Sequence, residues 1–495
     1  MSMLSALITV AAVVWMVGIS VVILMQRRSA AATMAWLLAL SFLPIIGLVV
    51  YRLFGPLRLE RKRLKRRVGR GAVSEALASL AELGRTSDEL AQLARVSISL
   101  GGSPPLGAHG VTLYTDGVAT YAAIAKAIGE ARHHIHVEYY IWSPDAIGTR
   151  MRDLLCARAR AGVKVRVVLD GMGAKACKKA FLAPFAEAGV ELAWFNPIRL
   201  RGLRLRRPDF RSHRKIVICD GRVGFTGGMN ITNEHSAEFT PDYWRDTHLR
   251  FEGPAVWALQ RLFLDDWYFA SERLPKIVPE FFPSAPDVTS NVPANVTSNM
   301  APDVTSNVTP DVDNHHILQV VGSGPDTSDF AIQRTLFTAI GQAQRRLWIT
   351  TPYFVPDEAI LTALVAAGLR RVDVRLIIPE KGDSRLVDLA ARSYIPELLA
   401  AGVRVFEYGP RFVHAKTLVV DDDLAVVGTA NLDNRSFRLN FELIAVIFGA
   451  ALNGQLAAAF AADLMATKEL ARDGGRPTFW TRLGQSGARL LSPLL

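Results

Sequence analysis

Four polar residues recur at the same spacing in two distant parts of the chain. Both stretches read H-x-K-x4-D-x6-G-[GT]-x-N. The first set comprises His213, Lys215, Asp220 and Asn230, and the second comprises His414, Lys416, Asp421 and Asn431. A single H-x-K occurs by chance in any long chain, whereas two copies that agree at every fixed polar position indicate a duplicated functional element.

These residue types suit the transfer of a phosphoryl group. A neutral histidine is a nucleophile or a proton carrier near neutral pH, and lysine and asparagine donate hydrogen bonds to phosphate oxygens. One histidine would attack and the other would protonate the leaving group. The candidate catalytic set is His213, Lys215, Asp220, His414, Lys416 and Asp421, and the candidate phosphate ligands are Asn230, Asn431 and the two lysines. The alternative, that both histidines are ordinary core residues, does not explain the matched spacing.

The local pattern predicts the elements that position these residues. Residues 215–220 and 416–421 are apolar, β-branched runs with polar ends, which predicts buried strands. Alternation places the histidine and lysine of each motif on one strand face. Second apolar runs, 223–226 and 425–427, end at glycines that allow backbone to approach a ligand closely. We interpret Asp220 and Asp421, at strand ends, as residues that hold loops.

The pair of motifs resembles the twin H-K-D motif of the phospholipase D superfamily, and the surrounding sequence is similar to its bacterial cardiolipin synthase branch. The resemblance covers nearly the whole chain except the region around 283–316. The matching stretches are Thr351–Asp357, Val372–Arg375, Asn431–Phe437, Leu439–Glu442, Glu138–Ile141 and Trp244–His248. The implied fold class is α/β, with two pseudo-twofold-related phospholipase D-like lobes of mixed β-sheets flanked by helices, preceded by a transmembrane helical hairpin.

The resemblance also implies a reaction. Both the donor and the acceptor would be phosphatidylglycerol, giving cardiolipin and glycerol. The residues themselves predict a phosphohistidine intermediate. We favour His213 as nucleophile and His414 as acid and base, but the pseudo-symmetry of the two motifs leaves the reverse assignment open. Asp246 and Glu442 would orient the two histidines, and an imidazole does need such a partner to fix its tautomer. No metal or other cofactor is expected. The alternatives are a phospholipase D that uses water or another alcohol, a nuclease of the same superfamily, and a non-catalytic scaffold.

Composition and hydropathy favour a membrane protein. The 495 residues are 50% hydrophobic and carry a net charge of +11, which suits an anionic lipid surface as partner. Two apolar runs, 4–25 and 30–54, predict a transmembrane hairpin rather than a signal peptide. The basic segment 58–67 predicts a catalytic body on the cytoplasmic side of a bacterial inner membrane. No nucleic-acid partner is expected, and the sequence does not indicate an oligomeric state.

The remaining sequence predicts the domain organisation. The expected parts are the hairpin (1–56), a basic segment and linker helix (57–107), lobe 1 (108–275), a repetitive disordered linker (276–316), lobe 2 (317–470) and a tail that docks at the membrane interface or packs on lobe 2 (471–495). Three cysteines without C-x-x-C spacing indicate buried thiols, and the histidines at 133, 134 and 136 lack the carboxylates of a metal site. An arginine-rich stretch predicts a funnel for anionic head groups, with a solvated basic loop as the alternative. It contains Arg199, Arg201, Arg204, Arg206, Arg207, Arg211 and Arg214.

Overall fold

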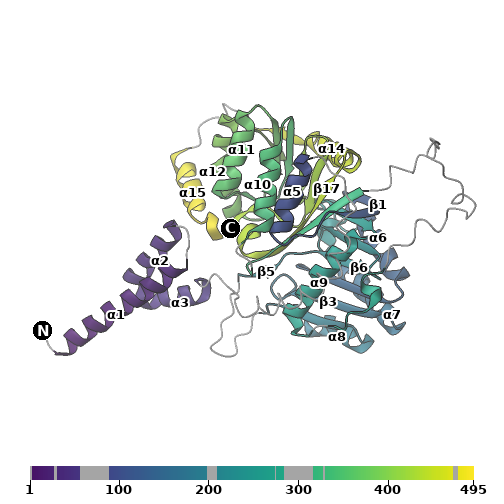
Figure 1. Cartoon of the computed structure of the whole chain (residues 1–495), viewed down its shortest axis with the longest axis horizontal. Coiled ribbons are helices and arrows are strands. Elements are labelled where there is room, and N and C mark those ends of the chain that lie inside the picture. The colour runs from purple at the N-terminus through teal and green to yellow at the C-terminus, as the bar shows by residue number, and fades with distance from the viewer. Residues whose placement is uncertain are drawn as a thin grey trace, which may run out of the picture. The chain divides into compact units, whose positions relative to one another are not determined.

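The computed structural model describes residues 3–26, 30–55, 88–197, 209–273, 275–283, 316–326, 329–471 and 478–494 (Figure 1). The chain forms two compact units. One contains Met1–Glu60 with Ile198–Phe210, and the other contains Arg61–Pro197 with Arg211–Leu495. The basic segment 58–67, the first five arginines of the predicted funnel and the repeats at 284–315 lie outside the described residues.

Within residues 3–26 and 30–55, the N-terminal unit forms three helices where the sequence predicts two. They are α1 (Met3–Met25), α2 (Ala30–Phe42) and α3 (Pro44–Phe54). The second expected span divides at Leu43, whose φ of −130° is not helical, because a proline disfavours helical backbone in the residue before it. Ile23, Leu40 and Tyr51 form a small buried cluster. Judged on the described residues, none of the helices has the combined length and hydropathy that crossing a bilayer demands, so the hairpin stays a prediction.

The larger unit is built on one 16-stranded mixed sheet. From the centre outward, its first half is ordered β1 (Leu106–Tyr114), β8 (His248–Glu252), β7 (Val223–Gly227), β6 (Ile216–Cys219), β2 (His134–Tyr139), β3 (Lys164–Asp170) and β4 (Glu191–Phe195). The second half repeats this order with β9 (His316–Ser323), β17 (Asn440–Phe448), β15 (Leu424–Gly428), β14 (Thr417–Val420), β10 (Arg346–Thr350), β12 (Asp373–Pro379) and β13 (Arg404–Tyr408), and adds β18 (Thr467–Glu469).

The two halves join through their first strands, because β1 pairs antiparallel with β9 at Leu106 and Leu318. The two expected sheets are therefore one continuous sheet. The duplication of strand order agrees with the repeated sequence pattern. Each histidine motif leads into the fourth strand from the centre of its half, which is β6 in the first and β14 in the second.

Helices cover the faces of the sheet (Figure 1). The first half carries α6 (Gly117–Glu130), α7 (Ala146–Arg160), α8 (Lys179–Ala188) and α9 (Ala255–Ser271), and the second carries α10 (Ala331–Gln342), α11 (Glu358–Leu369), α12 (Arg385–Ala400) and α14 (Ala450–Leu464). Each half has its own large apolar core. The described part of the predicted linker helix is α5 (Asp88–Ser99), whose Leu93 is buried in the core of the second half.

Two predicted boundary regions contain ordered structure. The short helix η2 (Pro279–Phe281) lies where the linker was expected to begin, and the Phe281 ring is buried 4.7 Å from that of His134. The tail forms α15 (Phe479–Leu490). Its Ala488 is buried, and its Arg489 guanidinium lies over the Tyr394 ring of α12. Phe479, Trp480 and Leu483 remain exposed.

Candidate active site

Each motif histidine lies where the backbone of one half pairs with the other half. The two-residue strand β5 (Arg211–Ser212) runs parallel to the start of β17, and the backbone N–H of His213 donates to Phe441 O at 2.8 Å. At the equivalent position before the second motif, Arg245 forms an isolated parallel β-bridge with Val413. The N–H of His414 donates to Arg245 O at 2.7 Å. Both histidines thus precede their strands instead of lying within them, and backbone bonds fix each against the opposite half.

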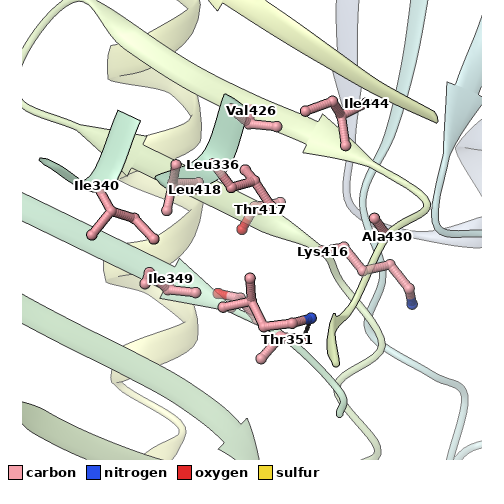
Figure 2. A pocket seen from close by; sticks show the side chains of 12 residues that line it. Leu336, Ile340, Ile349, Thr351, Lys416, Thr417, Leu418, Val426, Ala430 and Ile444 are labelled. Atoms are coloured by element: carbon pink, nitrogen blue, oxygen red, sulfur yellow. Dashed lines mark hydrogen bonds between the residues drawn. The ribbon is translucent and has the colours of Figure 1, made fainter. Parts of the chain in front are cut away.

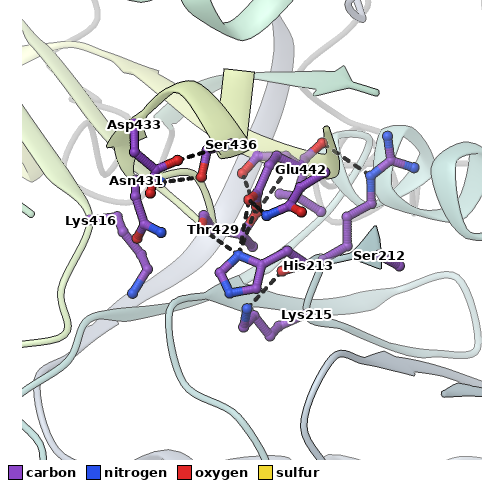
Figure 3. A network of polar contacts seen from close by, with 12 residues as sticks. Ser212, His213, Lys215, Lys416, Thr429, Asn431, Asp433, Ser436 and Glu442 are labelled. Atoms are coloured by element: carbon purple, nitrogen blue, oxygen red, sulfur yellow. Dashed lines mark hydrogen bonds and ion pairs between the residues drawn. The ribbon is translucent and has the colours of Figure 1, made fainter. Parts of the chain in front are cut away.

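The carboxylate that contacts His213 comes from the second half. Nδ1 of His213 lies 3.0 Å from a Glu442 carboxylate oxygen and 3.1 Å from Thr429 O. The Thr429 hydroxyl donates to the same carboxylate at 2.5 Å, and the Asn440 amide donates to its other oxygen at 3.1 Å. Figure 3 shows these contacts converging on the imidazole from β17 and the end of β15. With Nδ1 occupied, Nε2 is the nitrogen left for chemistry.

The carboxylate that contacts His414 comes, in turn, from the first half. Nδ1 of His414 lies 2.6 Å from Oδ2 of Asp246. A Cβ added at Gly228 would lie 2.0 Å from the Asp246 carboxylate, so only glycine leaves the carboxylate room to reach the histidine. The resemblance implied that these two carboxylates orient the histidines, and the structure adds that each one crosses to the other half.

Two buried lysines accompany the histidines. Lys215 Nζ donates to His213 O at 2.7 Å, and Lys416 donates to His414 O and lies 2.9 Å from His414 Nδ1. Burial lowers the pKa of Lys215 to about 7 and the pKa of Lys416 to about 8, because a desolvated cation is disfavoured.

Burial also acts on the histidines. It lowers the pKa of His213, against the opposing effect of Glu442, and it lowers the pKa of His414 to well below the ordinary value, together with the charges of Lys416, Lys215 and His213. Burial opposes ionisation of Glu442, but His213 and Lys215 outweigh it and lower the pKa of this carboxyl. The resting site therefore holds neutral imidazoles beside an ionised carboxylate, which suits nucleophilic attack.

The two motif asparagines are not equivalent. The Asn230 side-chain oxygen accepts from Ile141 N at 3.3 Å, and its carbonyl accepts from the Tyr121 hydroxyl at 2.5 Å. The side-chain oxygen of Asn431 is buried without a hydrogen-bond partner among the described residues. Asn431 N donates to Ser436 Oγ at 3.1 Å. The unpaired atom of Asn431 is thus an acceptor, and the group of this side chain that can donate to a phosphate oxygen is its Nδ2 amide.

Asp220 and Asp421 lie at the far ends of β6 and β14 from the lysines. Asp220 accepts from the backbone N–H groups of residues 132, 133 and 134 at 2.7 to 2.9 Å. Asp421 makes the same arrangement with residues 344, 345 and 346. Both have positive φ, 54° and 45°. Their contacts are those of residues that hold the start of a neighbouring strand.

The prediction of a lipid-facing arginine funnel is wrong for the two of its arginines that the structure describes. Arg211 and Arg214 are buried, each 1% exposed, and form ion pairs with Asp170 and Asp266. A buried guanidinium needs such a partner. These two arginines therefore stabilise the segment around His213, and they do not face lipid.

Sequence reasoning missed several residues around the histidines. The Tyr140 ring lies 5.1 Å from that of His213, and the Trp244 and Phe412 rings lie 5.1 and 5.8 Å from that of His414. Tyr140 and Trp244 belong to stretches that carry the resemblance, so position in a matching stretch was the available signal. Behind Lys416, an apolar cavity of about 20 Å³ is lined by residues such as Ile349 and Val426 (Figure 2). That volume holds about one water molecule and no acyl chain.

A duplicated α/β sheet that presents two carboxylate-backed histidines beside two buried lysines defines a phospholipase D-like protein. A family model described as "Cardiolipin synthase, PLD-like domain" matches residues 124–240 and 336–464, and one described as "Phospholipase D-nuclease N-terminal" matches 8–56. Cardiolipin synthase 1 of Bacillus anthracis is 37% identical over 99% of this chain and 95% of its own length. Cardiolipin synthase of Geobacillus kaustophilus is 37% identical over 96% and 91%.

Among solved structures, phosphatidylserine synthase of Haemophilus influenzae Rd KW20 superposes with a TM-score of 0.57 at 16% identity, covering 82% of this chain and 100% of that one. This likeness bears on the fold alone. With near full-length identity to curated relatives, the chain belongs to the cardiolipin synthase family, which comprises phosphatidyltransferases of the phospholipase D superfamily.

Proposed function

We propose that this protein transfers a phosphatidyl group from one phosphatidylglycerol to the terminal hydroxyl of another, giving cardiolipin and glycerol. The observation that carries the proposal is the exchanged pair of imidazole–carboxylate contacts, His213 with Glu442 and His414 with Asp246. It sets two neutral histidines beside two lysines suited to a phosphodiester. The family membership supplies the lipid substrate.

The proposed reaction has two steps. The negative charge of the bound phosphodiester favours protonation of His414. Nε2 of His213 then attacks phosphorus, a P–N bond forms, the P–O bond to glycerol breaks, and His414 gives its Nε2 proton to the departing oxygen. His414 then takes the proton of the second lipid's hydroxyl, whose oxygen attacks phosphorus and breaks the P–N bond. Lys215, Lys416 and Asn431 hold the phosphate oxygens, and stabilisation of developing charge by fixed donors is commonly the largest catalytic contribution.

The proposal includes a membrane setting. The N-terminal helices would anchor the protein in a bacterial inner membrane with the catalytic body in the cytoplasm, and anionic phospholipid would be both substrate and surface. The aromatic rings around His414 support a lipid alcohol over water as acceptor, because they place apolar surface beside the base. Cysteine accessibility of the body from the periplasmic side would contradict this topology.

One experiment tests the reaction. Membranes that contain the protein are incubated with head-group- and acyl-labelled phosphatidylglycerol, and the products are separated. Cardiolipin with free glycerol supports the proposal, whereas phosphatidic acid as the main product would make the protein a phospholipase D. Rapid denaturation in detergent at neutral pH, which spares the acid-labile P–N bond, is expected to trap the acyl label on the wild-type protein and on His414→Ala but not on His213→Ala. The reverse pattern would exchange the two histidine roles.

A further inference from the structure

One buried histidine has no part in the proposed reaction. His235 ends the short helix η1 (Asn233–His235) and is fully buried. Neither of its ring nitrogens has a hydrogen-bond partner among the described residues. An unpaired buried polar group costs about 1–3 kcal/mol, so such a side chain calls for an explanation, and an ordered water or a bound ion can supply one.

His235 faces the carboxylate that serves His414. Its Nδ1 lies 3.7 Å from Oδ2 of Asp246, and the same oxygen lies 2.6 Å from Nδ1 of His414. One ligand atom from each of the three residues can be chosen so that all lie within 4.8 Å of one another. Tetrahedral zinc with ligand bonds of about 2.0–2.2 Å places its ligands about 3.3 Å apart, so small side-chain movements would close the set.

The residues around this cluster have opposing effects on the binding of a metal ion. The Trp244 ring packs against both imidazoles at 5.2 and 5.1 Å, which shields the cluster from water. Lys416 lies 2.9 Å from His414 Nδ1 and would repel a cation while it is charged. Two ring nitrogens and one carboxylate oxygen nevertheless lie within 4.8 Å of one another, which is a donor set typical of a transition-metal site.

We propose that His235, Asp246 and His414 form an inhibitory site for a divalent transition-metal ion of the zinc class. Two imidazoles and one carboxylate suit zinc or cobalt, while magnesium and calcium require more oxygen ligands. A fourth position would remain for water.

Inhibition would follow because the ion would bind atoms of His414 and Asp246 that the reaction uses. Ligation uses the lone pair of His414 Nδ1, which leaves the ring proton on Nε2, so that His414 can no longer accept a proton there. It also removes Asp246 from its role beside the imidazole. The inhibition rests on the proposed function of His414, whereas the metal binding does not.

The test uses the full-length protein in phosphatidylglycerol nanodiscs after treatment with a chelator. Binding is measured without reference to activity, by zinc content after gel filtration and by the visible absorption of the cobalt-loaded protein. His235→Gln removes one ligand, and His235→Asn repeats this with a smaller side chain. His109→Gln is the matched control, because His109 is a half-exposed histidine beside Glu252, outside the cluster.

We expect one zinc per chain, tetrahedral cobalt absorption, and inhibition of cardiolipin formation that a chelator reverses. His235→Gln and His235→Asn should weaken binding at least about tenfold, as loss of even supporting partners does at metal sites, and His109→Gln should match the wild type. A wild-type protein that takes up no cobalt, or one whose cobalt absorption persists in both His235 variants, would overturn the metal site. Uptake of the metal without inhibition would overturn its inhibitory role and leave the binding site standing.

Discussion

At the scale of single residues, the decisive contacts are between each histidine and a carboxylate of the opposite half. An imidazole that attacks phosphorus or carries a proton becomes positively charged during the reaction, and an adjacent carboxylate both fixes the reactive tautomer and stabilises that charge. Thr429 and Asn440 hold Glu442 by hydrogen bonds, and Gly228 leaves the space that Asp246 occupies.

Neutralising either carboxylate should slow the reaction more than it weakens lipid binding. We expect Glu442→Gln and Asp246→Asn each to lower kcat by about 10²–10⁴-fold with a small change in KM, because the amide presents the wrong hydrogen-bonding pattern to Nδ1. Initial rates on mixed micelles of phosphatidylglycerol measure both constants. A rise in KM at unchanged kcat would show that the carboxylates act in binding instead.

The lysines predict the pH dependence. Their lowered pKa values, about 7 for Lys215 and about 8 for Lys416, mean that both are charged below pH 7 and lose charge as the pH rises through 7 to 8. Cardiolipin formation should therefore fall on the alkaline side of this range through a rising KM. Lys416→Arg stays charged throughout and should flatten the decline in whatever activity remains. A constant KM up to pH 10 in the wild type would contradict this reasoning.

At the scale of elements, residues at the ends of strands position the side chains of the site. Strand β7 ends at Gly227, directly before the space that Asp246 fills, and β6 and β14 end at aspartates with positive φ that accept three backbone N–H groups each. The motif therefore combines residues of two kinds: the histidine and lysine lie before the strand, and the aspartate anchors its other end.

Gly228→Ala tests the space beside Asp246. The added Cβ must push the carboxylate away from His414, and a displacement of about 1 Å can cost about 10²-fold in rate. We expect a loss of kcat of this size with little change in thermal stability. Gly129→Ala is the matched control, since a Cβ on this helical glycine would meet nothing within 4 Å.

The anchoring aspartates should affect folding before chemistry. Asp220→Ala leaves backbone N–H groups without their acceptor and places alanine at φ 54°, which should cost about 1–3 kcal/mol of unfolding free energy. Asp220→Asn keeps one acceptor oxygen and tolerates this φ, so its loss should be smaller. Denaturant unfolding ranks the two variants. A large fall in kcat of folded Asp220→Asn would instead place this residue in the chemistry.

Much of this local order was predictable, because apolar runs such as 216–219 and 417–420 are bounded by polar residues. The continuous sheet was not predictable, since nothing in β1 or β9 marks them as partners. The exchange of carboxylates was also hidden, because His213 and Glu442 are 229 positions apart. Arg211 and Arg214 resembled a solvated basic run, and only their distant partners Asp170 and Asp266 explain their burial. The run 30–54 was expected to form one helix, yet Pro44 divides it.

At the scale of the whole molecule, we propose that α15 docks on a lipid surface. Its polar face carries Arg482 and Arg489, and it contains no acidic residue. Phe479, Trp480 and Leu483 are exposed on one side, while Ala488 packs inward. Such a helix is typical of segments that lie in a membrane interface, and this proposal is compatible with the packing of the tail on α12.

A fluorophore can test α15 because the three native cysteines are buried. A polarity-sensitive label on Leu483→Cys should shift to the blue when the body meets phosphatidylglycerol vesicles, since the apolar face would enter the interface. The same label on Gln485→Cys, on the polar face, should shift much less. Equal shifts at both positions, or none at either, would contradict the proposed orientation.

The exchanged carboxylates make the two halves mutually dependent. A solitary copy of either half would carry an imidazole and a carboxylate that cannot reach each other. Two identical copies related by a twofold axis would, however, complete one another, because an isologous contact brings every such group to its counterpart. The single chain therefore contains the geometry of a symmetric dimer whose subunits have been joined end to end.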